Sequence, residues 1–236
     1  MDGPGYERSL LRIGGMAGIV GSLLGMVGNL IHPATPIDDP EGVARVIADS
    51  DAWVLIHLVI VVGITFMLGG LVALYHTIRE GVAGALARFG LVMAIVGITI
   101  GLLLVMIDGV AAKQLADEWA SAPSAERAVA LGLVHSNETV NFAVASLFNY
   151  IFAAATFILF GLAVALSDVY PRWLGWVAVA AGIDSIVAGS VQAFAGEPTD
   201  ASRILTIIGP TVITLWLLVM GILILRRSND RAGLVT

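Results

Sequence analysis

Cysteine is absent from this 236-residue chain, and lysine occurs once, at Lys113. Without cysteine the chain has no disulfide, no thiolate nucleophile, no iron–sulfur cluster and no zinc site with thiolate ligands. The position of the single lysine also excludes a retinal Schiff base, which needs a buried lysine in a late helix. Candidate sites must therefore be sought among histidine, carboxylate and other polar side chains.

Charged residues are also scarce. They make up 13% of the chain, against about 25% in an ordinary soluble domain, while hydrophobic residues make up 58% and the mean hydropathy is +0.94. These values do not describe a water-exposed surface, so lipid must cover most of the protein. The net charge of −6 argues against nucleic-acid binding, which requires clustered lysine and arginine.

Six long apolar runs account for this composition. They span residues 11–32, 53–76, 86–107, 141–166, 173–195 and 204–225. A hydrocarbon layer about 30 Å thick needs about 20 helical residues to cross it, and a helix satisfies its own backbone hydrogen bonds in lipid. The sequence therefore predicts an all-α, polytopic membrane bundle of six transmembrane helices, which forms a single domain over residues 1–236.

Two of the connections between runs contain helix-forming sequences of their own. Residues 111–120 and 125–133 are rich in strong helix formers, and Pro123 is the breaker between them. We therefore expect the third and fourth helices to extend beyond the outer face and to turn near Pro123. Residues 41–50 predict a short amphipathic helix with Val43, Val46 and Ile47 on one side.

Six spans place both termini on the same side of the membrane. Eight arginines fall on that side and four basic residues on the other, so the positive-inside rule predicts cytoplasmic termini. Acidic residues gather in the outer loops, with Asp38 and Glu197 among them. The eight are Arg8, Arg12, Arg79, Arg88, Arg172, Arg226, Arg227 and Arg231, and the four are Arg45, Lys113, Arg127 and Arg203.

The first run carries a stripe of small residues along one face. Such stripes let helix backbones approach closely in lipid. We expect this one to pack inside the bundle rather than to form a dimer interface, with Gly97 and Gly101 of the third helix as its partner face. The stripe consists of Gly14, Gly18, Gly21, Gly25 and Gly28, at spacings of four and three.

Four tryptophans lie near the ends of runs, at Trp53, Trp119, Trp173 and Trp176. This position is typical of side chains that anchor a helix at the membrane–water interface. Trp216 lies deeper in its run and is expected to pack between helices.

Asp184 is the ionisable residue placed deepest in a run, near the middle of the fifth. Ionisable residues within spans are costly and are functional hypotheses by default. Asp184 is therefore a candidate proton, cation or ligand contact. The alternative is a protonated, hydrogen-bonded carboxyl that holds the fifth helix to the sixth, near Pro210, where a backbone carbonyl is freed.

A second polar group lies at the outer ends of the runs. His135 and Glu138 are three residues apart and so share a helix face. Together with His57 and Asp108 they are candidate metal ligands, because imidazole and carboxylate suit zinc and an open position would activate water. No dense metal motif is present, and the alternative is local hydrogen bonding at the wet boundary. Asn29 and His32 close the first run at the same level, so that three histidines and two carboxylates lie there in all.

The same histidines admit a haem alternative. His57 and His135 would then face each other from the second and fourth helices as axial ligands. His76 is the only histidine near the other side. A chain of two haems across the bilayer is therefore not expected.

The fourth run continues the polar face of Glu138 inward through Asn141, Ser146 and Asn149. A polar stripe on a membrane helix should face protein or a cavity and not lipid. We therefore expect this helix to line the interior. Glu138, Asn141 and Asn149, with Asp184 contributing from the fifth helix, are the candidate ligand-binding residues.

Three short sequences carry a family resemblance: Arg-Ile-Gly-Gly at 12–15, Pro-Arg-Trp-Leu-Gly-Trp at 171–176 and Leu-Trp-Leu-Leu-Val-Met-Gly at 215–221. With the helix spacing, they resemble a broad bacterial and archaeal family of multi-pass membrane proteins catalogued only as a domain of unknown function. The resemblance implies about six helices and a bacterial or archaeal plasma membrane. It implies no reaction and no site residues.

The leading functional prediction is a non-enzymatic membrane protein that binds or passes a small or lipidic ligand, or that supports a complex of membrane subunits. The alternative is a membrane enzyme or redox protein with a zinc or haem site at the outer face. No internal repeat relates the two halves, so an inverted-repeat transporter is not supported. The expected partners are the lipid bilayer, a lipidic or small-molecule ligand and membrane subunits, and not nucleic acid.

Overall fold

A computed structural model describes residues 4–37, 39–196 and 199–230. Asp38, Glu197 and Arg231, which entered the charge argument above, lie outside these ranges. The described chain is helical and contains no strand, which confirms the predicted all-α class. Its α-helices are α1 (Pro4–Ile31), α2 (Pro40–Asp49), α3 (Trp53–Thr77), α4 (Gly81–Met106), α5 (Ala112–Ser121), α6 (Arg127–Phe148), α7 (Phe157–Leu166), α8 (Arg172–Ala195) and α9 (Asp200–Asp230), and its π-helices are η1 (Ile107–Ala111) and η2 (Asn149–Thr156).

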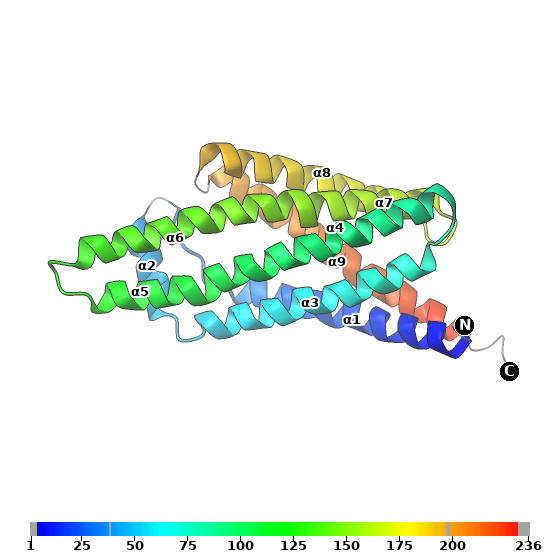
Figure 1. The fold of residues 1–236 in the computed structure, drawn as a ribbon, viewed down its shortest axis with the longest axis horizontal. Helices are drawn as coiled ribbons and strands as arrows, with labels where there is room; N and C mark the ends of the chain where they lie inside the picture. Colours follow the sequence, from blue (N-terminus) through cyan, green and yellow to red (C-terminus); the bar gives the residue numbers. More distant parts are fainter. Residues whose placement is uncertain (1–3, 38, 197–198, 231–236) are drawn as a thin grey trace.

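Six of the described helical segments are long and apolar enough to cross a membrane, as predicted. Two of them are much longer than a bilayer requires. The α4–η1–α5 segment runs over Gly81–Ser121 and the α6–η2–α7 segment over Arg127–Leu166. The two turn into each other through Ala122 to Glu126 at one end of the molecule (Figure 1), which confirms the predicted extension and the turn near Pro123. We call this the extended end.

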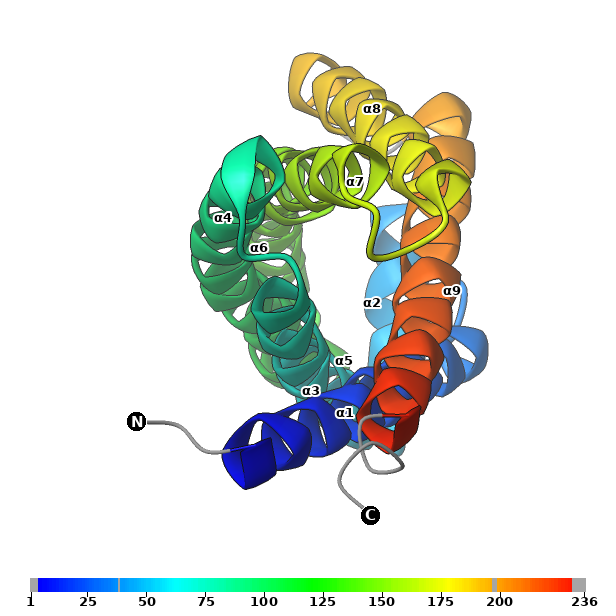
Figure 2. The same ribbon diagram turned by 90° about the vertical axis from the view of Figure 1, so that its right-hand side faces the viewer.

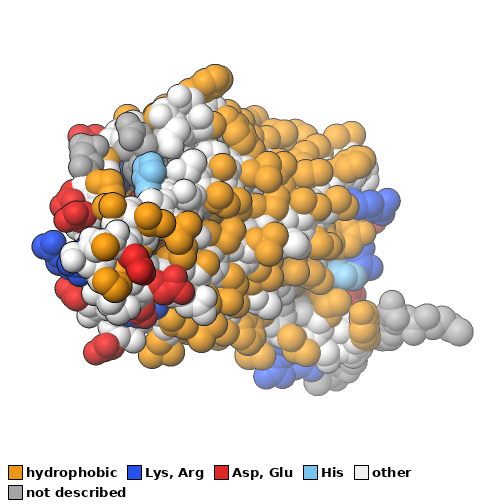
Figure 3. Space-filling model, turned by 60° about the vertical axis from the view of Figure 1, so that its left-hand side comes forward, with side chains coloured by type: hydrophobic (Ala, Val, Ile, Leu, Met, Phe, Trp, Pro, Cys, Tyr) orange, Lys and Arg blue, Asp and Glu red, His pale blue; other side chains and the backbone are white. Residues whose placement is uncertain are grey.

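The surface fits a membrane protein. On the face shown in Figure 3, hydrophobic side chains form a broad belt across the middle of the molecule, and charged side chains gather toward its two ends. Large apolar side chains on every long segment are exposed, as with Leu55, Phe89 and Ile183. So many exposed apolar side chains on one surface would be unfavourable in water. Lipid is therefore the solvent that matches the belt.

The six spans form a closed ring when viewed along the long axis (Figure 2). Each contacts its neighbour in the chain, from α1 to α3, α4, α6–α7, α8 and α9, and α9 closes the ring on α1. The first turn of α1 and the last turn of α9 lie at the same end of the molecule, opposite the extended end (Figure 1). We call this the terminal end.

The extended end has a small core of its own, built by α2. Asp39 caps this helix by accepting a hydrogen bond from the Gly42 backbone N–H at 2.9 Å. Val43 and Ile47 of the predicted amphipathic face are buried against α5, which confirms that face. Lys113 of α5 donates to the Ala48 carbonyl at 2.7 Å. The α2 helix is therefore held firmly across the extensions.

The glycine stripe of α1 packs inside the chain, as predicted, but its predicted partner face is wrong. The stripe lies against α3, where Gly63 and Gly70 let the two backbones meet. Gly97 and Gly101 of α4 instead accommodate Phe152 and Phe148. The α1–α3 connection contains only residues 32–52, which favours direct neighbours in the ring.

The interfacial prediction for tryptophan holds only in part. Trp173 and Trp176 are exposed, but Trp53 is 1% exposed and Trp119 is 5% exposed. Both buried rings pack against α2. The apolar runs alone did not indicate that this helix covers them. Trp216 is buried, as predicted, and donates from Nε1 to the Leu174 carbonyl at 2.8 Å.

Candidate functional site

The ring of helices contains a partly open cavity of about 820 Å³. Its wall along α6 and η2 runs from His135 to Ala153, a distance of roughly 27 Å at 1.5 Å per helical residue. Residues 33–37 and the start of α2 line it near the extended end. The cavity therefore reaches from the extended end into the middle of the bundle.

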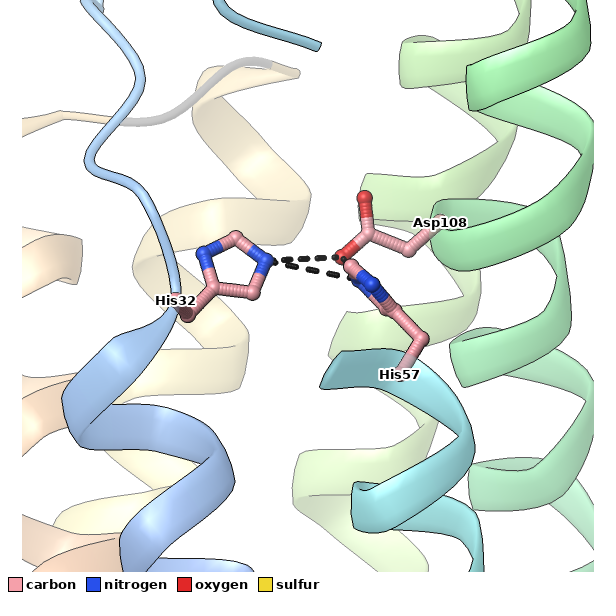
Figure 4. A group of neighbouring side chains, drawn as sticks. All are labelled: His32, His57 and Asp108. Atoms are coloured by element: carbon pink, nitrogen blue, oxygen red, sulfur yellow. Dashed lines mark hydrogen bonds and ion pairs between the residues drawn. The ribbon is translucent and has the colours of Figure 1, made fainter. Parts of the chain in front are cut away.

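Three chemically active side chains meet at the wall of this cavity: His32, His57 and Asp108 (Figure 4). Nε2 of His57 lies 3.1 Å from Oδ2 of Asp108 and 3.3 Å from Nε2 of His32. Nε2 of His32 lies 3.9 Å from the same oxygen. The three atoms thus form a compact triangle, although their residues come from three different segments.

Local structure fixes the orientation of each member of this His32–His57–Asp108 cluster. His57 lies one turn after Trp53 in α3, and its Nδ1 bonds to the Trp53 carbonyl at 2.7 Å. His32 follows the end of α1, and its Nδ1 bonds to the Pro33 carbonyl at 2.9 Å. Asp108 lies in η1, whose backbone carbonyl at this residue accepts from Trp53 Nε1 at 2.8 Å.

Gly109 allows the π-helix η1 to approach α3 closely. A Cβ at this position would collide with the side chain of His57. π-Helices are rare and frequently mark functional sites. The combination of η1 and Gly109 therefore brings the Asp108 carboxylate to the histidines.

The environment of His32 favours a neutral ring. Burial lowers the pKa of His32 below its ordinary value, and the nearby His57 lowers it further. The Asp108 carboxylate and the Pro33 carbonyl oppose this shift by stabilising the charged form. Burial is the largest of these influences.

The structure unites only part of the predicted metal set. His57 and Asp108 meet, whereas His135 and Glu138 line the same cavity outside the cluster. His32, one of the three histidines that the sequence placed at this level but not one of the four candidate ligands, is the third member. Its participation depends on how the chain turns after α1, and no spacing in the sequence indicates that turn.

Amide side chains line the cavity beyond this cluster. Asn141 and Asn149 are there as predicted, and Gln192 of α8 joins them. Asn149 is 4% exposed and Gln192 is 7% exposed, yet neither makes a side-chain hydrogen bond within the described chain. Oδ1 of Asn141 is also buried without a described partner. Buried amides of this kind normally bond to something, so the cavity offers free donors and acceptors.

The profile of a family described as a domain of unknown function (DUF4386) matches residues 13–221. The chain belongs to the DUF4386 family. This confirms the resemblance found in the sequence, and the family description names no reaction. The comparisons with curated proteins and with solved structures each gave no match.

Asp184 of this DUF4386 protein lies apart from the cavity wall. It is on α8, where its Oδ2 faces the backbone of Gly209 on α9, next to Pro210. Asp184 is not among the residues that line the cavity, although Pro210 is. This position matches the predicted proximity to Pro210 and does not bring Asp184 to Glu138, Asn141 or Asn149.

Proposed function

We propose that this DUF4386 protein binds an amphiphilic ligand, with an alkyl chain and a polar head group, in the cavity of the helix ring. The observation that carries the proposal is that the cavity wall is polar near the extended end and mostly apolar further into the bundle. Its volume of about 820 Å³ is in the range of small-molecule sites, which run to about 1,000 Å³. In an amphiphilic ligand, the head group would match the polar part of the wall near the extended end, which we call the outer end of the cavity. The alkyl chain would match the apolar part, which we call the inner wall.

The inner wall is suited to an alkyl chain. It consists mostly of aliphatic and phenylalanine side chains, with the unpartnered amides of Asn149 and Gln192 between them. Such a wall gains dispersion contacts from a chain that fills it. The apolar members are Ile60, Ile64, Met67, Leu104, Val105, Phe142, Phe148, Phe152 and Ile213.

The outer end is suited to an anionic head group. Arg203, at the start of α9, lines the cavity there with Asn29 and the two histidines of the cluster. A guanidinium group matches carboxylate and phosphate oxygens geometrically. Asp108 and Glu138 lie at the same end, so the head group would meet a mixed polar surface.

Binding is favoured over passage through the membrane. Toward the terminal end, the described interior is filled by large side chains that are essentially inaccessible, among them Leu71, Leu74, Phe157, Phe160 and Leu217. A transport path would need polar groups through this region. The cavity therefore supports a binding role, alone or within a larger membrane complex.

We also place the terminal end on the cytoplasmic side of a bacterial or archaeal plasma membrane. The basic residues of that end, including Arg12, Arg79 and Arg88, support this orientation by the positive-inside rule. The acidic residues of the extended end fit an external location. The family resemblance supports the type of membrane.

An enzyme or redox protein with a metal or haem site is the second candidate, and the His32–His57–Asp108 cluster favours its metal form. Haem is favoured less. Nε2 of His57, the atom that would bind the iron, is already 3.1 Å from Asp108 and 3.3 Å from His32. A porphyrin coordinated there would have to displace both side chains.

A cavity-filling substitution tests the binding proposal. Ala145→Phe places a ring in the cavity, because Ala145 lines it. We expect this variant to bind dansyl-undecanoic acid at least about tenfold more weakly than the wild type, since the lost space removes contacts worth more than about 1.4 kcal/mol. The measurement is a fluorescence titration of the protein purified in detergent, with palmitate as competitor.

Ala143→Phe is the matched control, because Ala143 is two residues away on the same helix and is exposed. It should bind the probe like the wild type. Equal loss in both variants would point to a general disturbance of the bundle. Equal retention would point to uptake of the probe by the detergent-covered surface and would contradict the assignment of the cavity. Size-exclusion chromatography of each variant shows that the comparison is between folded proteins.

A further inference from the structure

We propose that His32, His57 and Asp108 form a three-ligand site for a divalent transition-metal ion, best matched by zinc, with its fourth coordination position facing the cavity. This goes beyond amphiphile binding, because the ion would be held by the protein alone. The proposal differs from the ligand set expected from the sequence, since His32 replaces His135 and Glu138. Four observations on the cluster support it.

The first observation concerns where the imidazole protons are. Nδ1 of His57 faces the Trp53 carbonyl and Nδ1 of His32 faces the Pro33 carbonyl. A carbonyl oxygen can only accept, so each Nδ1 must carry a proton and donate it. In the neutral ring, Nε2 is then an unprotonated acceptor. The two Nε2 atoms nevertheless face each other at 3.3 Å.

The convergence of acceptors calls for a positive charge between them. The Asp108 carboxylate adds a third acceptor, 3.1 Å from His57 Nε2. Three lone-pair atoms without a hydrogen between them repel one another at these distances. A metal ion removes the repulsion by accepting all three. A proton on one Nε2 is the competing occupant, and it would make that ring an imidazolium.

The distances match a tetrahedral centre. Ligand atoms bound at about 2.0–2.2 Å in tetrahedral zinc sites are roughly 3.3–3.6 Å apart. The three separations in the cluster are 3.1, 3.3 and 3.9 Å. A shift of a few tenths of an ångström at His32 would therefore complete the geometry.

The surroundings resemble the support that metal-bound histidines usually have. Such histidines donate their second ring N–H to a carbonyl or carboxylate, which fixes the ring. Both histidines do so here, and the Trp53 ring lies 4.7 Å from His32 and 5.0 Å from His57. Trp53 also holds the Asp108 backbone through its indole N–H. Trp53, a buried residue, thus contacts all three ligand residues through its ring, its indole N–H or its backbone carbonyl.

The donor set points to zinc among common ions. Two imidazoles and one carboxylate are typical of zinc sites with an open position, whereas magnesium and calcium prefer oxygen ligands. Because all three side chains line the cavity, the open position faces into it. Water or an anionic oxygen would complete the coordination.

The test is metal binding by the purified protein. The chain is freed of metal by a chelator and titrated with Zn²⁺ against a chromophoric zinc indicator, and bound zinc is counted by elemental analysis after gel filtration. We expect one zinc per chain. Cobalt substitution should give the intense visible bands of tetrahedral Co²⁺, which a proton-filled cluster does not give.

Variants locate the ion. His32→Ala and Asp108→Asn should each weaken zinc binding by at least about 100-fold, since loss of a direct ligand exceeds the effect of losing its support. Asp108→Asn keeps the size of the side chain and the hydrogen bond from Trp53 to the backbone of residue 108. A loss of zinc binding in this variant is therefore not explained by unfolding. His76→Ala, at the terminal end, should bind zinc like the wild type.

Three outcomes would overturn the proposal. Absence of stoichiometric zinc binding by the folded wild type would leave a proton as the occupant. Unchanged affinity in His32→Ala would remove that residue from the ligand set. Equal loss in His135→Ala and His32→Ala would show that the ligand set is not the three residues His32, His57 and Asp108. None of these results depends on whether an amphiphile binds.

Discussion

Replacing Gly21 with alanine should lower the free energy of unfolding by about 3 kcal/mol, at the upper end of the usual cost of overpacking. A Cβ on Gly21 would lie 2.6 Å from the backbone nitrogen of Met67 and 2.7 Å from the carbonyl oxygen of Gly63. Both are backbone atoms, so no side chain can rotate away. The α1 and α3 helices would have to separate along their whole contact.

Gly132→Ala is the matched control for this substitution. Gly132 also lies within a helix, but a Cβ there would have no neighbour within 4 Å. Because alanine is the better helix former, this variant should be unchanged or more stable by about 0.5–1 kcal/mol. Equilibrium unfolding in mixed detergent–SDS micelles, followed by tryptophan fluorescence, gives both values. Equal stability of the two variants would contradict the α1–α3 packing.

Zinc should stabilise the folded protein strongly. A ligand that binds only the folded state, at about 1,000 times its dissociation constant, adds about 4 kcal/mol to the free energy of unfolding. The His32–His57–Asp108 cluster joins segments that are 25 and 51 residues apart in the chain, so unfolding must disperse the ligands. Thermal unfolding followed by intrinsic fluorescence should therefore shift upward on addition of Zn²⁺.

Two controls show whether the rise in unfolding temperature comes from zinc bound at the His32–His57–Asp108 cluster. Mg²⁺ at the same concentration should leave the unfolding temperature unchanged, because it prefers six oxygen ligands. Asp108→Asn should lose the zinc shift while retaining the unfolding temperature of the metal-free wild type within a few degrees. A zinc shift of the same size in Asp108→Asn would assign the stabilisation to another part of the chain.

The spans were predictable because lipid imposes a simple rule on sequence. Continuous apolar runs of bilayer length become helices, and the described segments follow the predicted runs closely. The extension of α5 and α6 was also predictable, since strong helix formers around Pro123 leave few alternatives. Glycine spacing on α1 indicated close packing correctly.

Which helices meet was not predictable from the same rules. Gly21 and Gly97 are both small residues in apolar runs, and only the ring order assigns the first to α3 and the second to Phe152. Apolar periodicity says little when lipid and protein neighbours are equally apolar. The burial of Trp53 likewise depends on the position of α2.

The sequence predicted which kinds of residue line the candidate site, but not which particular residues come together there. Polar residues at those ends of the runs that lie toward the extended end indicated the level of the cavity, and the stripe through Asn141 and Asn149 indicated its wall. The π-helices η1 and η2 were not foreseen, and each shifts the register of the residues that follow. His32 and Gln192 join the cavity through a turn and a helix crossing that no local pattern specifies.

Photocrosslinking tests the central claim, that the ring contains a binding cavity, most directly. The purified protein is illuminated with a palmitate analogue that carries a diazirine near the end of its chain, and the adducts are mapped by mass spectrometry. We expect adducts on the inner wall, at residues such as Phe148 and Phe152, and their loss with excess palmitate or in Ala145→Phe. Adducts confined to the exposed belt, at residues such as Leu55 and Phe89, would contradict the account.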